Sequence, residues 1–282
     1  GTGDNTSSNV TASNLSLLMY GNSYTGANGL ASLVDGILDQ SGYNGTVDAN
    51  VGGGMKLPQH WQNLATPSNQ WNTSLRSNQW DYVILQDQSQ VPSFPTTEPM
   101  WQDSKNASVN LSAEIEAEGS ETFLFMTWGY RDGDSLNSFN NNYTAMQSRL
   151  TEGYTRYAEN ISTAGHNVWM APVGLAYKNV HDAVVADGDD PTLSGNLFYD
   201  LYTSDGSHPS LTGSYLSACV IFSSMTGDLC SASNDSVAIN ATIKLELQQV
   251  ADDTVFNQTT GMSYYPWEIT GTSAFGMGSS IP

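Results

Sequence analysis

The stretch LSLLMYGNSYTGANGL (residues 15–30) indicates the fold class, because an apolar run ends in a turn and a helical pattern follows at once. The apolar run at 15–21 predicts a short buried strand. Apolar residues then recur at helical spacing from Leu30 to Leu38, and Gly42 suits the end of that helix. A strand that leads through a tight turn into a helix is the repeating unit of a parallel α/β sheet.

Four further apolar runs predict strands, and helical patterns separate them. The five predicted strands cover residues 15–21, 46–52, 80–86, 121–128 and 166–174. The predicted helices cover residues 27–42, 98–119, 139–165, 174–188 and 210–227, of which 210–227 is the last long one. The tail from about residue 231 is ambiguous. Alternating strands and helices imply parallel strands joined by right-handed crossovers, and continuous apolar runs imply cover on both faces. We therefore expect a three-layer α/β/α sandwich around a parallel sheet of about five strands.

The composition limits the number of domains and the class of partner. With 282 residues, the chain can bury one sizeable core, and we expect a flexible N-terminal segment at 1–14 and one domain at 15–282. The net charge is −20, yet only 13% of the residues are charged, so the imbalance reflects missing Lys and Arg. Binding of nucleic acid needs clustered basic residues and is excluded. No apolar run reaches the roughly 18 residues that cross a bilayer.

Two features bear on localisation. The sequence contains 12 Asn-x-Ser/Thr acceptor sites, where its composition predicts about 5 by chance. This excess favours an extracellular or cell-surface protein. Cys219 and Cys230 lie 11 residues apart, and an exported chain could join them, although a buried free thiol at Cys219 is an equal alternative.

A second stretch, LYTSDGSHPSLTGSYLSACVIF (residues 201–222), carries the chemistry. Asp205 and His208 lie three residues apart, just ahead of an apolar helix, while Ser23 lies between an apolar strand and a helix. A serine hydroxyl activated by a histidine, which an aspartate orients, is the machinery of a nucleophilic hydrolase.

Other polar segments directly follow predicted strands, at 52–54, 86–89 and 128–131. Carboxyl ends of parallel strands meet at one edge of the sheet, where ligands bind. We therefore expect these segments to surround Ser23.

Together, GNSYT (21–25), the glycines at 52–54, the polar amides of LQDQSQVP (85–92) and DGSHPS (205–210) resemble the SGNH (GDSL-type) hydrolase superfamily. The resemblance covers residues 15–226 and implies a flavodoxin-like sheet. It implies that Ser23 is the nucleophile, that Asp205 and His208 complete a triad, and that no metal or cofactor is needed. It also implies an oxyanion hole made by the Ser23 N–H, a glycine N–H and an asparagine side chain. The glycine corresponds to Gly54, with Gly53 as the alternative.

The chain departs from that superfamily in its third block, which normally reads G-x-N-D and here contains no asparagine. Gln88 aligns with the missing asparagine, and Gln86 is the alternative. Loss of one such donor costs roughly 3–4 kcal/mol of transition-state stabilisation, so we expect a substitute. The variant resembles a branch of SGNH-like proteins of unassigned function, to whose second block His60 and Trp61 fit.

The expected substrate is a short-chain carboxylic ester, a small molecule or an O-acetylated carbohydrate. Tyr24, Trp128, Tyr130 and His60 are the predicted pocket residues, His60 being either a structural residue or a pocket wall. The acidic segments 131–134 and 187–190 are predicted to be solvated turns rather than calcium sites. Two alternatives stay open: a non-catalytic carbohydrate-binding or surface protein with this fold, and a lipase or phospholipid deacylase. The sequence leaves the oligomeric state open.

Overall fold

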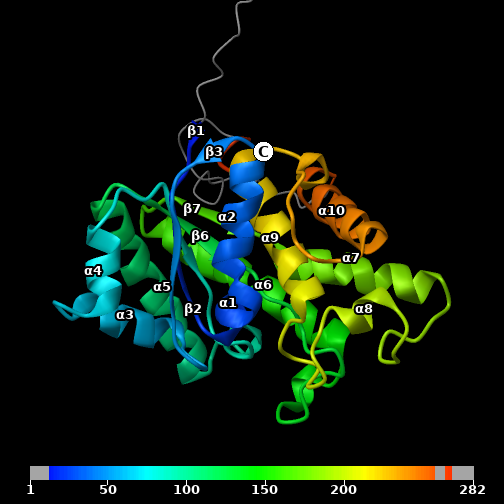
Figure 1. Ribbon diagram of the computed structural model, residues 1–282. Coiled ribbons are helices and arrows are strands. Elements are labelled where there is room, and N and C mark those ends of the chain that lie inside the picture. Colours follow the sequence, from blue (N-terminus) through cyan, green and yellow to red (C-terminus); the bar gives the residue numbers. More distant parts are fainter. Residues whose placement is uncertain (1–12, 258–263, 269–282) are drawn as a thin grey trace, which may run out of the picture.

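The five predicted apolar runs form one parallel sheet (Figure 1). The computed structural model describes residues 13–257 and 264–268. Within them, the sheet has the strand order β4-β2-β5-β6-β7, and every neighbouring pair is parallel. Its strands are β2 (Leu17–Gly21), β4 (Val47–Val51), β5 (Tyr82–Leu85), β6 (Glu121–Phe125) and β7 (Val168–Ala171). This order is that of the doubly wound, flavodoxin-like sheet.

The strand order determines where a ligand can bind. Leu17 of β2 pairs with Val47 of β4 on one side and with Tyr82 of β5 on the other. The chain therefore winds one way from β2 to β4 and the opposite way from β2 to β5. Open α/β sheets bind ligands at the carboxyl ends of the strands beside such a reversal. In this molecule the turn after β2 and the loop after β5 meet there.

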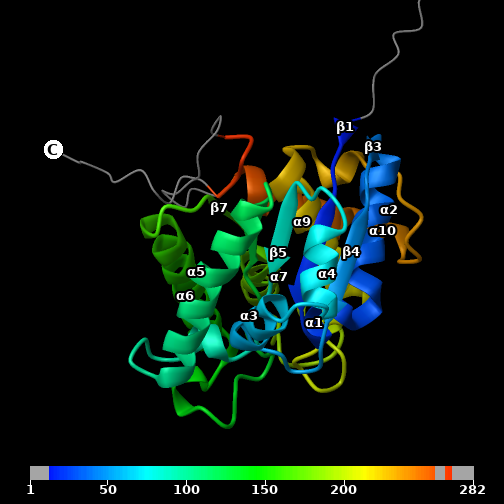
Figure 2. The same cartoon turned by 90° about the vertical axis from the view of Figure 1, so that its left-hand side faces the viewer.

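Helices cover both faces of the sheet, because β2, β5, β6 and β7 are buried on both sides. Figure 1 shows α3, α4 and α5 on one side of the sheet and α2, α9 and α10 on the other, while Figure 2 shows α6 beside α5. The helices of these two layers are α2 (Leu30–Gln40), α3 (Leu57–Ala65), α4 (Gln70–Arg76), α5 (Pro99–Ala117), α6 (Tyr143–Thr163), α7 (Val173–Ala186), α9 (Leu211–Thr226) and α10 (Ala241–Phe256). Helix α7 contacts α6 of one layer and α9 and α10 of the other, next to the edge strand β7.

Short elements complete the fold. They are α1 (Ser23–Gly26), α8 (Leu197–Asp200) and the 3₁₀ turns η1 (Ala27–Gly29), η2 (Val91–Ser93), η3 (Ser138–Asn140) and η4 (Cys230–Ala232). Strands β1 (Ser13–Asn14) and β3 (Tyr43–Asn44) form a separate parallel pair. Ser13 and Asn14 therefore lie in a strand, and the rest of the predicted flexible segment, residues 1–12, lies outside the described residues.

Several helices were not predicted, and one prediction was wrong: α9 is not the last long helix, because α10 follows it. The buried face of α10 includes Gln248, Asp252 and Thr254, so its polar interior hides the apolar periodicity. Helices α3 and α4 are short, which leaves too few turns to establish a period. The strand predicted at 166–174 ends at Ala171 because α7 begins at Val173.

The two cysteines are joined, which decides between the two alternatives that the sequence leaves open. A disulfide links Cys219 of α9 to Cys230 of η4. Asp252 of α10 supports this junction by accepting hydrogen bonds from the Cys230 N–H (2.7 Å) and the Ser231 N–H (3.2 Å). The disulfide and the buried carboxylate together attach α10 and its preceding loop to α9.

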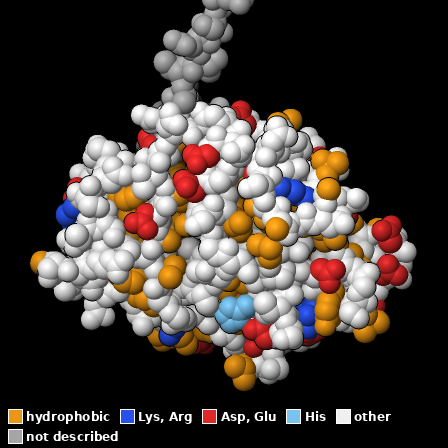
Figure 3. All heavy atoms as spheres, in the orientation of Figure 1, with side chains coloured by type: hydrophobic (Ala, Val, Ile, Leu, Met, Phe, Trp, Pro, Cys, Tyr) orange, Lys and Arg blue, Asp and Glu red, His pale blue; other side chains and the backbone are white. Residues whose placement is uncertain are grey.

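The surface is mostly uncharged and polar, as Figure 3 shows for one face, with few basic side chains. In the described part of the chain, every helix is too short or too polar to span a bilayer.

Candidate active site

Ser23 lies at the first position of α1, directly after β2, in a turn that two side chains hold. Asn22 caps α1 by accepting a hydrogen bond from the Tyr24 N–H at 3.0 Å. The Gln86 Oε1 accepts hydrogen bonds from the Asn22 N–H (2.9 Å) and the Thr25 hydroxyl (2.8 Å). At Gly21, a Cβ atom would lie 2.1 Å from Thr25 Oγ1, so no larger residue fits. The Ser23 N–H belongs to the first turn of a helix, whose N–H groups have no intrahelical partner.

His208 reaches Ser23 from the loop before α9. Its Nε2 lies 2.9 Å from Ser23 Oγ, and its Nδ1 lies 2.6 Å from Asp205 Oδ2. An ionised carboxylate only accepts hydrogen bonds, so Nδ1 carries the proton and Nε2 is free to accept the serine proton. The three residues that the sequence predicted as a triad are therefore joined in one hydrogen-bonded row.

The loop around Asp205 keeps its carboxylate charged. The other carboxylate oxygen, Oδ1, accepts hydrogen bonds from the Ser207 N–H, the His208 N–H and the Thr203 hydroxyl, each at 2.9 Å. Partial burial acts to raise the pKa of Asp205, but these hydrogen bonds and the one from the His208 ring outweigh burial and hold the pKa well below its usual range.

A cavity of about 280 Å³ opens in front of the Ser23 hydroxyl. It lies where segments after β2, β4, β5 and β6 meet the loop before α9, as the sheet topology requires. Its lining residues are Asn22, Ser23, Tyr24, Gly54, Gln88, Ser89, Tyr130, Ser207 and His208. Two pairs of hydroxyls belong to this lining: Tyr24 pairs with Ser207 (2.6 Å) and Tyr130 pairs with Ser89 (2.7 Å).

Of the two glutamines that the sequence offered as oxyanion donors, only Gln88 lines this cavity. Gln86 is fully buried, its oxygen serves the turn around Ser23, and its amide nitrogen donates to the Asp87 carbonyl. Gln88 accepts hydrogen bonds through Oε1 from the backbone N–H groups of Gln90 (2.8 Å) and Val91 (3.2 Å). A carboxamide held by its oxygen must present its NH₂ group on the other side.

Of the two candidate glycines, Gly54 lines the cavity and Gly53 does not. Gly54 has a φ of 65°, which glycine adopts without strain.

The buried Asp87 connects the segment after Gly54 to Gln88, because its Oδ1 accepts from the Leu57 N–H (3.0 Å) and from the Gln88 N–H (2.8 Å). Burial raises the pKa of Asp87, although the hydrogen bonds from Leu57 and Gln88 act in the opposite direction.

Two of the predicted pocket residues lie outside the cavity. Trp128 is fully buried beneath the wall, where it stacks on Tyr24 with ring centroids 4.6 Å apart. His60 is also fully buried, and its Nδ1 accepts a hydrogen bond from the Trp71 indole at 2.9 Å. Burial lowers the pKa of His60 to about 4. The placement of Trp128 in the pocket wall was therefore wrong, and of the two alternatives for His60 the structural one holds, because both rings pack in the interior.

Sequence reasoning missed three wall residues, Asn22, Ser89 and Ser207, although each lies inside a block that it had singled out. It also took the segment 131–134 for a solvated turn, whereas Asp134 is only 4% exposed. Asp134 accepts a hydrogen bond from the Gln90 side chain at 2.7 Å, so this segment supports the loop that follows β5.

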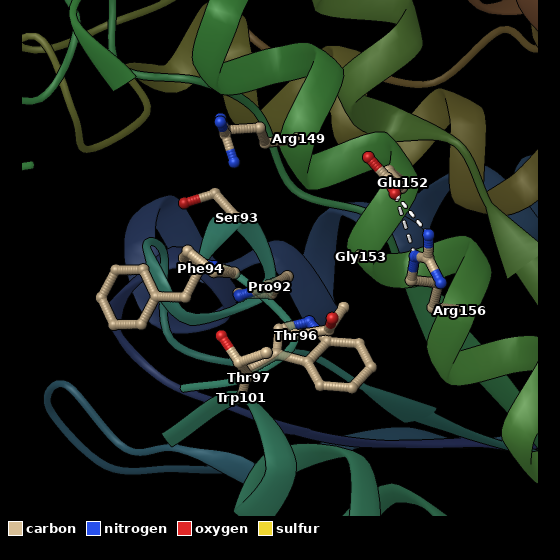
Figure 4. Close-up of a pocket in the computed structure, with 11 residues that line it drawn as sticks. Pro92, Ser93, Phe94, Thr96, Thr97, Trp101, Arg149, Glu152, Gly153 and Arg156 are labelled. Carbon is tan, nitrogen blue, oxygen red and sulfur yellow. Dashed lines mark hydrogen bonds and ion pairs between the residues drawn. The ribbon is translucent and has the colours of Figure 1, made fainter. Parts of the chain in front are cut away.

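A second hollow, of about 230 Å³, lies on the other side of that loop. Figure 4 shows the loop residues Pro92, Phe94 and Thr96 facing α6, where Glu152 pairs with Arg156. Gly153 of α6 packs so closely against the loop that a Cβ atom there would lie 1.8 Å from the Pro92 carbonyl oxygen. The hollow contains no serine–histidine pair, and its tight floor anchors the loop that carries Gln88.

Similarity to known proteins is found among solved structures. No protein-family model matches the chain, and no curated protein matches it. Among solved structures, it is similar to a DUF4886 family protein from Bacteroides uniformis, with a TM-score of 0.67 and 19% identity over 86% of this chain and 96% of that one.

It is also similar to a candidate SGNH hydrolase from Slackia heliotrinireducens, with a TM-score of 0.56 and 25% identity over 74% of this chain and 97% of the other. A GDSL-like lipase candidate from Parabacteroides merdae matches with a TM-score of 0.51 and 13% identity over 74% of this chain and 94% of that one. With its five-stranded parallel sheet and helices on both faces, this chain has the fold of the SGNH hydrolases.

Proposed function

We propose that this protein is a serine esterase that hydrolyses short-chain carboxylic esters through a covalent acyl-enzyme. The observation that carries the proposal is the hydrogen-bonded row from Ser23 Oγ through the His208 ring to the Asp205 carboxylate. A binding module has no need of a serine hydroxyl, a correctly protonated imidazole and a charged carboxylate in register. The structural neighbours described as SGNH hydrolases support the same class of reaction.

In the first half of the reaction, Ser23 Oγ attacks the ester carbonyl carbon while His208 Nε2 takes the hydroxyl proton. Asp205 stabilises the imidazolium that forms. The carbonyl oxygen becomes an oxyanion, which we assign to the N–H groups of Ser23 and Gly54 and to the Gln88 amide. The intermediate collapses when the C–O bond breaks and His208 returns the proton to the leaving alcohol.

In the second half, water replaces the alcohol. The water oxygen attacks the acyl carbon while His208 takes a proton from the water. The bond between the acyl carbon and Ser23 Oγ then breaks as His208 protonates Ser23 Oγ. The products are a free acid and the regenerated hydroxyl. No step requires a metal ion or a redox cofactor.

The size of the cavity favours a small acyl group. Its volume is about 280 Å³, so the far end of a long alkyl chain would lie in solvent. An acetyl group on a small alcohol or a carbohydrate suits this site. The disulfide and the excess of Asn-x-Ser/Thr sites support an extracellular or cell-surface location, where acylated carbohydrates occur.

The test compares hydrolysis of nitrophenyl acetate, butyrate and decanoate by the wild type, by Ser23→Ala and by Ser32→Ala. Ser32 is an exposed residue of α2 and provides the same chemical change away from the cavity. We expect the acetate rate to exceed the decanoate rate, to vanish in Ser23→Ala and to persist in Ser32→Ala. A preference for decanoate would instead favour a lipase.

A fluorophosphonate probe provides a second readout that does not depend on the choice of ester. We expect one probe molecule per chain, attached to Ser23 in the digested protein, and no labelling of Ser23→Ala. Folded wild-type protein that neither reacts with the probe nor hydrolyses any of the three esters would contradict the proposal and favour a non-catalytic binding role.

A further inference from the structure

A chain of three side chains runs from Asp134 to the edge of the cavity. Asp134 Oδ2 accepts a hydrogen bond from Gln90 Nε2 at 2.7 Å, and Gln90 Oε1 accepts one from Gln88 Nε2 at 3.2 Å. Gln88 Oε1 in turn accepts from the backbone N–H groups of Gln90 and Val91. The catalytic steps above use only the last member, Gln88.

The chemistry at the two ends determines how both carboxamides face. Backbone N–H groups only donate, so the oxygen of Gln88 must face Gln90 N and Val91 N, and its nitrogen must face the other way. An ionised carboxylate only accepts, so the nitrogen of Gln90 must face Asp134, and its oxygen is left for Gln88. Neither amide can be reversed without bringing two donors or two acceptors together.

The surroundings of Asp134 suit a hydrogen-bond acceptor. It is 4% exposed, and its other contacts are also donors: the Leu136 N–H at 2.9 Å and the Asn137 side-chain amide at 2.6 Å. Within residues 13–257 and 264–268, no ion pair involves Asp134. Burial of a carboxylate without a cation costs free energy, and an acceptor that orders the loop explains its presence here.

We propose that Asp134 and Gln90 are positioning residues that hold the Gln88 carboxamide with its second N–H directed at the reacting carbonyl oxygen. One hydrogen of the Gln88 NH₂ group is used by Gln90, which leaves the other for the oxyanion. This inference rests on the proposed esterase function. It explains how glutamine, with one more methylene than asparagine, is held as rigidly as an oxyanion donor must be.

The test exchanges hydrogen-bond donors and acceptors along the row from Asp134 through Gln90 to Gln88. Asp134→Asn keeps the shape, but its oxygen must still serve the Leu136 N–H, so its NH₂ group faces the NH₂ of Gln90. Gln90→Glu places a carboxylate against Asp134. We expect each variant to lower kcat for nitrophenyl acetate about 10- to 100-fold, with KM changed less than about twofold, because one oxyanion donor is worth about 10²- to 10³-fold.

The double variant, Asp134→Asn with Gln90→Glu, is the decisive sample. The carboxylate introduced at position 90 can accept from the amide introduced at position 134 and from Gln88 Nε2, while the net charge stays that of the wild type. We expect its kcat to exceed that of either single variant by at least about tenfold. In a Gln88→Ala background, Asp134→Asn should have no further effect. Asp187→Asn, an exposed change at the end of α7, is the charge control and should retain the wild-type rate.

Two results would overturn the inference: a folded Asp134→Asn variant with the wild-type kcat, or a folded double variant no faster than the singles. If Asp134→Asn does not fold, Gln90→Met, which removes the link alone, must show the same fall in kcat. The NMR signal of the Gln88 side-chain amide, assigned by its loss in Gln88→Ala, should shift in Asp134→Asn and return in the double variant. This readout tests the inference even where the wild type hydrolyses no ester.

Discussion

Ser23 Oγ and His208 Nε2 lie 2.9 Å apart, although 185 residues separate them in the chain. Hydrogen bonds close to this pair also join the N-terminal part of the chain to the segment that carries His208. Asn28 donates hydrogen bonds from its side chain to the Pro209 carbonyl (3.1 Å) and to the Ser214 hydroxyl (2.9 Å). The turn η1, which follows the short helix of Ser23, is therefore attached to the start of α9.

Asp205→Asn should lower kcat for ester hydrolysis by about 10⁴-fold, the loss measured for the equivalent change in a serine protease triad. The asparagine oxygen can keep the backbone contacts of Asp205 Oδ1, but its NH₂ group then faces His208 Nδ1 and favours the wrong tautomer. Steady-state kinetics with nitrophenyl acetate measure the effect, and Asp200→Asn, an exposed carboxylate of α8, is the control. Retention of more than a tenth of the wild-type kcat would argue against Asp205 as the orienting residue.

The two glutamines after β5 should respond differently to replacement by alanine. Gln88→Ala should lower kcat about 100-fold with little change in thermal stability, because a donor to the oxyanion is lost. Gln86→Ala should lower the free energy of unfolding by about 1–3 kcal/mol, since it leaves the buried Asn22 N–H and Thr25 hydroxyl without their acceptor. Parallel kinetics and urea unfolding separate the two effects. A Gln86→Ala variant with wild-type stability and no activity would instead make Gln86 the oxyanion donor.

His60 should make the protein less stable in mild acid. Its pKa is about 4 in the folded state, against about 6.5 when unfolded, so it is neutral in the fold and charges on unfolding. The stability that it contributes is complete above about pH 6.5 and is lost as the pH falls towards 4, by roughly 3 kcal/mol at most.

His60→Asn tests this pH dependence, because an asparagine oxygen can still accept the Trp71 N–H and does not titrate. Urea unfolding at several pH values between 4 and 7 should give a shallower fall in stability for the variant than for the wild type. A difference in the free energy of unfolding that is the same at every pH is expected from the smaller asparagine side chain and does not bear on titration. Parallel curves would show that His60 is not the group responsible.

Loss of the disulfide should destabilise the protein by about 3 kcal/mol, the value expected for a closed loop with a sequence separation of 11 residues. Cys219→Ala/Cys230→Ala and reduction of the wild type should have similar effects on urea unfolding. Reductant added to the double variant serves as the control and should change nothing. An unchanged midpoint after verified reduction would mean that Asp252 and the surrounding packing hold this junction alone.

The five strands of the central sheet and the helices α2, α5, α6, α7 and α9 could be predicted because burial leaves a local trace in the sequence. The apolar runs from Leu17 and from Val83 are buried on both sides, and each is recognisable without its neighbours. Helix α10 could not be recognised in this way, since Asp252 faces the interior to bind the Cys230 N–H. Its polar side chain is explained by a partner 22 residues away, which no local period reveals.

Local patterns predicted the five strands of the sheet, five of its helices and the residues of the proposed triad, because apolar periodicity and the spacing of Asp205 and His208 are local properties. Contacts between distant parts of the fold were needed to establish that Gln88 lines the cavity while Gln86 supports the serine turn, and that His60 and Trp128 are interior. For Gln86 and Trp128 the reason is that the partner of each side chain lies in a distant segment. Gln86 serves Asn22 N–H, 64 residues away, and Trp128 donates to the Ser207 carbonyl, 79 residues away.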